Sequence, residues 1–524
     1  MTAAGDSLVR GLAANYLGKA FTAFLSLVTL PILYRQLGGE AFGVFGLFFS
    51  VQVLLGVFDF GVGAAMQRDL AALQAGAPTP RAADVVATVR SIERMLWGIV
   101  VLACALAAAG NEWIAGHWLH VQALPLDLVA RALFWMAVAA SLQFIGNFYT
   151  GCLNGLRRHR QTNALQSAVW ALRFVLLLWC VQAGVAPAGT MEGAVVTVLQ
   201  AWAASNALHV LAARVMLMRS LPAAAGEPGV AHLRQAARFG LPLVAATTLI
   251  MLFNQVDKLA ASRLLALDSL GRYTIVWSIA EVMYLMYQPV YTSFLPIFAS
   301  RQAAARASGD AAGLWQSIAL AWRVMSIAVL PVAVVIFAMP GLVILAWTGD
   351  GQLAESGGGV LRWIIAGAAV NSFLFIPFAL QQAAGDLRPW TWRIALALVF
   401  YAPLAILAIH RWGMLGAAAA WCAGSVVLAI WLARASGQSV PDAPAGSGFL
   451  DALLPGSLRT LLPCAAVAVL GAWLPWPAGR VGAAVLALAV LAVCGFVALR
   501  SQPQLWTWCM QMLARLRGGR ALTP

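Results

Sequence analysis

Charged side chains that interrupt long apolar stretches are the residues most able to do chemistry in this chain. A charged group at the centre of a bilayer costs about 2.5 to 3.5 kcal/mol, so each is expected to face a partner or a watery space. The positions are Lys19, Asp59, Arg173, Asp257, Lys258, Glu281 and Arg323.

Basic residues outnumber acidic ones in the deeper part of these stretches. Counting 1.5 Å per residue from the inner boundary places Lys19 about 10 Å deep, Arg323 about 13 Å and Arg173 about 18 Å. A cation about 4 Å from a phosphate gains about 4 kcal/mol at an effective dielectric constant of 20. We therefore expect Lys19, Arg173, Lys258 and Arg323 to bind an anionic substrate in a shared cavity.

Ordinary ion pairing is the alternative for several of these residues. Asp257 is adjacent to Lys258, and Glu281 could pair with Arg323 across a helix contact. If they are not consumed in such pairs, Asp257 and Glu281 are candidate sites for a coupling cation or proton.

Asp59 is a weaker candidate for the same ion-coupling role. It lies near the inner end of its apolar stretch, where Arg68 and Arg94 are plausible hydrogen-bond partners, so a structural role is favoured.

The sequence lacks the motifs of an enzyme or a metalloprotein. The 7 cysteines lie singly and the 6 histidines are scattered, so neither a disulfide framework nor a zinc site is predicted. Neither lysine lies in a phosphate-binding loop, and no H-E-x-x-H or G-x-S-x-G sequence occurs. We expect no catalytic residue, no cofactor and no metal.

The overall composition indicates the environment in which these charged residues lie. Of 524 residues, 62% are hydrophobic and 10% charged, and mean hydropathy is +0.83, which indicates an all-α polytopic membrane protein. The formal net charge of +14 is carried mainly by arginines between apolar runs, so it indicates topology and contact with anionic membrane lipids rather than nucleic acid.

Apolar runs of spanning length predict fourteen transmembrane helices, of which twelve form a core. The core runs lie near 12–34, 41–66, 94–116, 126–152, 161–182, 191–213, 238–262, 270–298, 314–347, 360–384, 393–410 and 412–433, followed by an added pair near 458–475 and 479–499. Pro289 and Pro296 are expected to interrupt one span twice. Arginines gather in alternate loops, which places both termini in the cytoplasm.

An internal repeat predicts the arrangement of the spans. RQLGGEAFGVF at 35–45 matches RLLALDSLGRY at 263–273 with an offset of 228. FIGNFYTGCLNGLR at 144–157 matches FIPFALQQAAGDLR at 375–388 with an offset of 231. Two similar offsets indicate a duplicated six-span unit, and an even span count makes the repeats parallel. Two such lobes with a site between them are typical of alternating-access carriers.

The predicted organisation has two lobes, two linkers and a C-terminal extension. The segments are an N-terminal six-helix lobe (1–214), a cytoplasmic linker (215–237), a C-terminal six-helix lobe (238–434), a second linker (435–457), an extra helix pair (458–499) and a basic amphipathic tail (500–524).

The stretch from Tyr34 to Ala71 resembles the opening of Wzx-type polysaccharide-unit flippases, which belong to the multidrug/oligosaccharidyl-lipid/polysaccharide exporter superfamily. The likeness rests on an L-G-x-E-x-[FY]-G turn at Leu37 to Gly43, a D-[FL]-G at Asp59 to Gly61, and Arg68. N-Q-V-D-K at Asn254 to Lys258 resembles the start of the family's second lobe. The resemblance covers roughly the first 430 residues.

The resemblance implies a V-shaped pair of helical lobes in the bacterial inner membrane. Its substrate would be an undecaprenyl-pyrophosphate-linked oligosaccharide, a repeat unit of O-antigen or exopolysaccharide. Lys19, Arg173 and Arg323 would draw in the pyrophosphate. A polysaccharide polymerase and a chain-length regulator are the protein partners that this pathway suggests.

Other functions remain open at this point. The fourteen-span count is similar to that of lipid II flippases of the same superfamily. A multidrug antiporter of the same fold would need an acidic cavity for cationic drugs, whereas the internal charges here are mostly basic. A membrane polymerase or ligase would need catalytic loop residues that the sequence lacks, and a structural scaffold would not need internal cations.

Overall fold

A computed structural model describes most of the chain. The described residues are 3–56, 58, 62–74, 82–182, 194–221, 245–308, 312–385, 387–437, 449–475, 479–507 and 510–511. For residues 3–23 the helical backbone is described. Of the predicted linkers 215–237 and 435–457, residues 222–237 and 438–448 lie outside these ranges, and so does most of the predicted tail 500–524.

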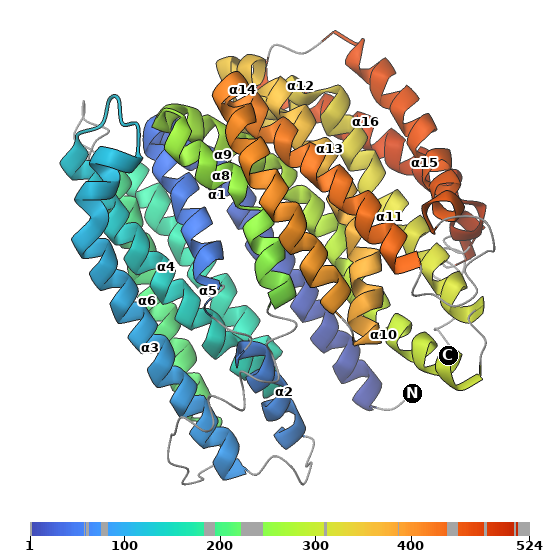
Figure 1. Cartoon of the computed structure of the whole chain (residues 1–524), viewed down its shortest axis with the longest axis horizontal. Helices are drawn as coiled ribbons and strands as arrows, with labels where there is room; N and C mark the ends of the chain where they lie inside the picture. Colours follow the sequence, from blue (N-terminus) through green and yellow to red (C-terminus); the bar gives the residue numbers. More distant parts are fainter. Residues whose placement is uncertain are drawn as a thin grey trace. The chain divides into compact units, whose positions relative to one another are not determined.

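The described residues form helices, joined by short turns (Figure 1). They contain no strand, only one isolated bridge between His120 and Ala266. Nine helices in this part of the chain are long and apolar enough to cross a membrane. The predicted all-α polytopic class is thereby confirmed, while the count of fourteen spans and the layout of the repeats stay predictions.

The chain divides into two compact units, Met1–Ile275 and Val276–Pro524. Unit 1 contains α1 (Ala3–Gly56), α2 (Val62–Gln74), α3 (Ala82–Trp113) with a π-helical turn to Trp118, α4 (Leu126–Gly155), α5 (His159–Gln182), α6 (Ala194–Met218), α8 (Val256–Leu264) and the first part of α9 (Leu267–Ala280).

Unit 2 contains the last residues of α9 and all the later helices. These are α10 (Val282–Ser308), α11 (Ala312–Ala338), α12 (Pro340–Thr348), α13 (Gly351–Ala384), α14 (Arg388–Gly437), α15 (Phe449–Ala472) and α16 (Arg480–Arg500).

Two long helices are each broken at a glycine with positive φ. The break in α1 is at Gly38 (φ 80°) and the break in α14 is at Gly413 (φ 56°). Only glycine enters this backbone region without strain, so each glycine turns one long helix into two segments. The break at Gly38 falls between two predicted spans, whereas Gly413 is the second residue of the predicted span 412–433.

One interruption differs from the sequence prediction. α10 runs through Pro289 and Pro296 as a single helix, and the break lies earlier, at Glu281, between α9 and α10. The amide of Glu281 bonds the carbonyl of Ser278 at 3.3 Å, as expected for a turn rather than a continuing helix. The prolines therefore stay inside the helix, and a charged residue marks its start.

The L-G-x-E-x-[FY]-G turn has a clear structural role in unit 1. After the break at Gly38, the Glu40 carboxylate accepts the backbone N–H of Gln122 at 2.6 Å and that of Ala123 at 2.9 Å. A carboxylate that accepts two backbone amides holds the loop before α4 against the start of the second α1 segment.

The two matched motifs of the predicted repeat touch each other within unit 1. A Cβ atom on Gly43 would collide with the carbonyl oxygen of Leu267, and one on Gly271 would collide with that of Gly39. Gly43 and Gly271 are 228 residues apart, and so are Gly39 and Leu267, so the predicted repeat makes the two contacts equivalent. The glycines therefore allow two helices to approach closely and symmetrically.

Candidate functional site

Arg173 lies in the interior of unit 1. It projects from the middle of α5 and is 7% exposed. Its Nε donates to the Ser205 hydroxyl at 2.9 Å, and its Nη2 donates to Gln143 Oε1 at 3.3 Å and to the side-chain oxygen of Asn206. The partners come from α4 and α6, so three helices converge on one guanidinium.

The Arg173 guanidinium is surrounded by uncharged protein groups. The rings of Trp170 and Trp202 each lie 5.0 Å from its central carbon, within cation–π range. Among the described residues, no carboxylate pairs with Arg173. Since arginine stays protonated in proteins, the site keeps a full positive charge inside the unit. It borders a crevice of about 20 Å³ that also touches Thr29 of α1.

Asp257 and Lys258 form an ion pair, which is one of the two alternatives that the sequence allows for them. The Asp257 side chain is fully buried, and Lys258 Nζ lies 3.3 Å from its Oδ2. Lys258 also donates to the carbonyl of Asn254 at 2.9 Å, and the hydroxyl of Tyr273 donates to Asp257. Much of the charge of Lys258 is therefore offset locally.

The other predicted residues belong to unit 2 or lie wholly or partly outside the described residues. Arg323 of α11 donates to Gln504, beyond the end of α16. Glu281 is exposed at the break before α10. The side chain of Lys19 and all of Asp59 lie outside the described residues. Arg68, one suggested partner of Asp59, forms an ion pair with Asp69 at 2.6 Å.

A polar face on α10 escaped the sequence prediction. α10 has 27 residues, about 40 Å of helix, yet it is not among the nine helices apolar enough to qualify as spans. Tyr284 and Thr292 are exposed and Gln288 is half-buried on one face, which continues the line of Glu281. Their spacing of three or four residues would have revealed the face.

Aromatic rings support this polar face within unit 2. The Tyr284 and Tyr287 rings are 5.5 Å apart, and Tyr287 stacks on Phe375 of α13 at 4.1 Å. Tyr291 packs against Phe375 at 5.5 Å and donates its hydroxyl to Gln382 at 2.6 Å. The tyrosines form an ordered ladder, with Tyr284 at 52% exposure. Ring faces with hydroxyl tips suit ligands that are partly apolar and partly hydroxylated.

Comparison with known proteins gives a consistent family. The profile of the family described as "Polysaccharide biosynthesis protein" matches residues 8–302. The Shigella flexneri protein named "Putative O-antigen transporter" is 20% identical over 425 residues, which cover 79% of this chain and 94% of that protein.

Solved structures show the same fold. The lipid II flippase MurJ in an inward-closed conformation superposes with a TM-score of 0.67 at 12% identity, over 93% of this chain and 98% of that one. An inward-facing MATE-family multidrug resistance transporter of the MOP superfamily gives a TM-score of 0.65 at 16% identity, over 80% and 96% of the two chains.

Proposed function

The chain belongs to the polysaccharide biosynthesis protein family, and from this premise we propose that it moves an undecaprenyl-pyrophosphate-linked oligosaccharide across the bacterial inner membrane by alternating access. The cargo would be a repeat unit of O-antigen or exopolysaccharide. In this proposal the lobes are residues 1–214 and 238–434, both termini are cytoplasmic, and a polymerase receives the product.

The polar face of α10 is the observation that carries the proposal. An exposed row of polar and aromatic side chains on a membrane-length helix is unfavourable against acyl chains, so it should border a water-filled path. Sugars offer both hydroxyl groups and apolar C–H faces. Tyr284, Gln288 and Thr292 supply matching hydrogen-bond groups and a ring. We assign this face to the glycan part of the substrate.

The basic residues are assigned to the pyrophosphate. Arg173 supports this assignment best, because neutral partners leave its charge available to attract an anion. Lys19, Lys258 and Arg323 complete the proposed set, with Lys258 weakened by its pairing with Asp257. Asp257, Glu281 and Asp59 remain the proposed coupling-ion or ion-pair positions.

The membrane potential favours this direction of transport. Outward movement of a negative charge across an inside-negative membrane gains about 2.3 kcal/mol per charge per 100 mV. In this proposal, coupling to an ion serves to reset the empty carrier rather than to drive the loaded step.

A flipping assay in proteoliposomes tests the function. The protein is reconstituted with a lipid-linked O-antigen unit, with lipid II, or with a cationic drug in separate vesicles. We expect rapid appearance of the O-antigen unit in the opposite leaflet. Transport of lipid II alone, or of the drug alone, would contradict the proposal.

A substitution in the α10 face tests the glycan assignment. Tyr284→Ala should slow flipping about fivefold, because one aromatic contact contributes about 1 kcal/mol. Phe400→Ala is the matched control, since Phe400 is 70% exposed on α14 and apolar. Equal rates in both variants would remove Tyr284 from the glycan path while leaving the function itself testable by the substrate comparison.

A further inference from the structure

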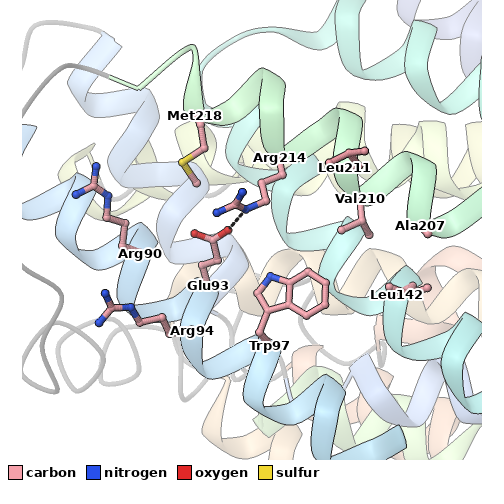
Figure 2. Close-up of a pocket in the computed structure, with 10 residues that line it drawn as sticks. All are labelled: Arg90, Glu93, Arg94, Trp97, Leu142, Ala207, Val210, Leu211, Arg214 and Met218. Atoms are coloured by element: carbon pink, nitrogen blue, oxygen red, sulfur yellow. Dashed lines mark hydrogen bonds and ion pairs between the residues drawn. The ribbon is translucent and has the colours of Figure 1, made fainter.

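Unit 1 contains a second charged region, a cavity of about 840 Å³ between α3, α4 and α6. α4 packs against both α3 and α6 (Figure 1), and Leu142 of α4 lines the cavity. Figure 2 shows Arg90 and Arg94 at one end, Arg214 next to them beside Glu93, and Leu142 and Leu211 toward the other end. The volume lies in the range of small-molecule sites.

A hydrogen-bonded network builds the wall at the charged end. Glu93 is 7% exposed, and its Oε1 accepts Arg214 Nε at 2.6 Å and the Tyr149 hydroxyl at 2.7 Å. Trp97 Nε1 donates to the same hydroxyl at 3.1 Å. The Arg214 side chain stays 48% exposed and lines the cavity.

The cavity carries an excess positive charge. Glu93 offsets the charge of Arg214, which leaves Arg90 and Arg94. Both are exposed, and neither makes an ion pair or hydrogen bond with another residue in the described ranges. Guanidinium groups bind phosphate oxygens in bidentate fashion, and this geometry is the reason arginine is favoured at phosphate sites.

The helices place the charged end at the membrane surface. The segment Ala82–Trp118 has 37 residues, about 55 Å of helix, whereas the hydrocarbon core is about 30 Å thick. Arg90 and Arg94 lie about 12 and 18 Å from the start of α3. They can therefore reach the headgroup layer, and Trp97 follows at the depth typical of interfacial aromatic residues.

The uncharged end continues into the apolar surface. Leu211 lines the cavity and is 60% exposed, and Leu208 beside it on α6 is 51% exposed. On α3, Leu102 is 58% exposed. In a membrane protein such residues contact acyl chains, so the cavity joins a charged end to a lipid-contacting surface.

We propose that this cavity is a binding site for one anionic phospholipid of the surrounding leaflet. Arg90, Arg94 and Arg214 bind the headgroup phosphate, and an acyl chain lies over Leu142 and Leu211. Among the described residues that line the cavity, none belongs to the proposed pyrophosphate set. Binding is measured without glycolipid, so it stands or fails independently of transport.

Lipid titration of the purified full-length protein tests the site. Phosphatidylglycerol and phosphatidylcholine are titrated separately, inorganic phosphate is then added to the phosphatidylglycerol complex, and bound lipid is counted by native mass spectrometry. We expect phosphatidylglycerol to bind and phosphatidylcholine to bind much more weakly. Equal binding of both lipids, or displacement of phosphatidylglycerol by an equal concentration of inorganic phosphate, would overturn the proposal.

The double variant Arg90→Gln, Arg94→Gln should weaken phosphatidylglycerol binding about 30-fold, because each arginine near the surface contributes about fivefold. The matched control, Arg158→Gln with Arg160→Gln, removes the same charge from exposed positions outside the cavity. Wild-type affinity in the first variant, or an equal loss in both, would overturn the assignment.

A pair of charge-neutral substitutions tests the placement of the acyl chain. Ala207→Phe fills the apolar end of the cavity, whereas Ala109→Phe adds the same volume to an exposed position on α3. We expect several-fold weaker binding only for Ala207→Phe. Unchanged binding in that variant would overturn the placement of the acyl chain in the cavity.

Discussion

Arg173 and Arg214 lie on neighbouring helices of the same unit, yet they are stabilised in opposite ways. Arg173 is 7% exposed and bonds a serine, a glutamine and an asparagine between two indole rings. Arg214 is 48% exposed and bonds a buried glutamate. Neutral dipoles hold the first cation, and a carboxylate holds the second.

The difference decides how much charge each region can offer to a ligand. A carboxylate partner cancels most of the field of Arg214, so the lipid cavity depends on Arg90 and Arg94. Amide and hydroxyl partners leave the charge of Arg173 intact. However, the same partners surround the guanidinium and leave only a small crevice beside it, so a ligand has little room there.

The largest effect is expected at the buried cation. Arg173→Ala should lower the apparent free energy of unfolding by about 3 kcal/mol, because Ser205, Gln143 and Asn206 lose a charged donor and the two indoles lose the group between them. The thermal midpoint of purified protein measures the loss.

The exposed Arg160 on the same helix is the control for this substitution. Arg160→Ala should change stability by less than about 0.5 kcal/mol. If Arg173→Ala were equally harmless, its hydrogen bonds would contribute little, and the contrast between the two arginines would fail.

Smaller losses of stability are expected at the ion pair between Arg214 and Glu93, and the two substitutions should differ in size. Arg214→Gln should cost about 2 kcal/mol, because it leaves the buried Glu93 carboxylate with the Tyr149 hydroxyl as its main remaining donor. Glu93→Gln should cost less, since its amide oxygen still accepts hydrogen bonds and the exposed Arg214 can be hydrated. The same thermal assay compares them. The reverse order would show that Arg214, not Glu93, is the buried partner.

Tyr149→Phe should have a still smaller effect of about 1 kcal/mol. It removes the hydroxyl that donates to Glu93 and accepts from Trp97, while the buried ring stays in place. In the Glu93→Gln background the loss should shrink, because a neutral amide is a weaker acceptor than a carboxylate. A double-mutant cycle measures this coupling, and strict additivity would argue against one connected network.

Local signals in the sequence are enough to predict the helical class, the family and the ion pair between Asp257 and Lys258. The adjacency of Asp257 and Lys258 already suggested the ion pair that the structure shows. The glycine-rich turn at Gly38 likewise predicted a break between spans. In each case the deciding groups are close in sequence, so pattern and residue chemistry are sufficient.

Long-range contacts account for what the sequence missed. Glu93 lies 56 residues from Tyr149 and 121 from Arg214, so nothing local predicts their network. Basic residues such as Arg90 and Arg214 predict only topology, because a basic loop residue and a phosphate ligand look alike in sequence. The spacing of Tyr284, Tyr287 and Tyr291 does place them along one helix, but it does not predict that their rings pack on Phe375 and leave Tyr284 exposed.

The smallest stability effect is expected where the proposed ligand contacts are strongest. Without lipid, the variant Arg90→Gln, Arg94→Gln should unfold within about 0.5 kcal/mol of wild type, because both side chains are exposed and unpaired among the described residues. Phosphatidylglycerol at ten times the wild-type dissociation constant should raise the free energy of unfolding of the wild type by about 1.4 kcal/mol. The same concentration should raise that of a variant with 30-fold weaker binding by only about 0.2 kcal/mol. Thermal midpoints with and without lipid measure both quantities. A large loss without lipid would make these arginines structural, like Arg173, and would end the contrast between a buried, positioned cation and an accessible one.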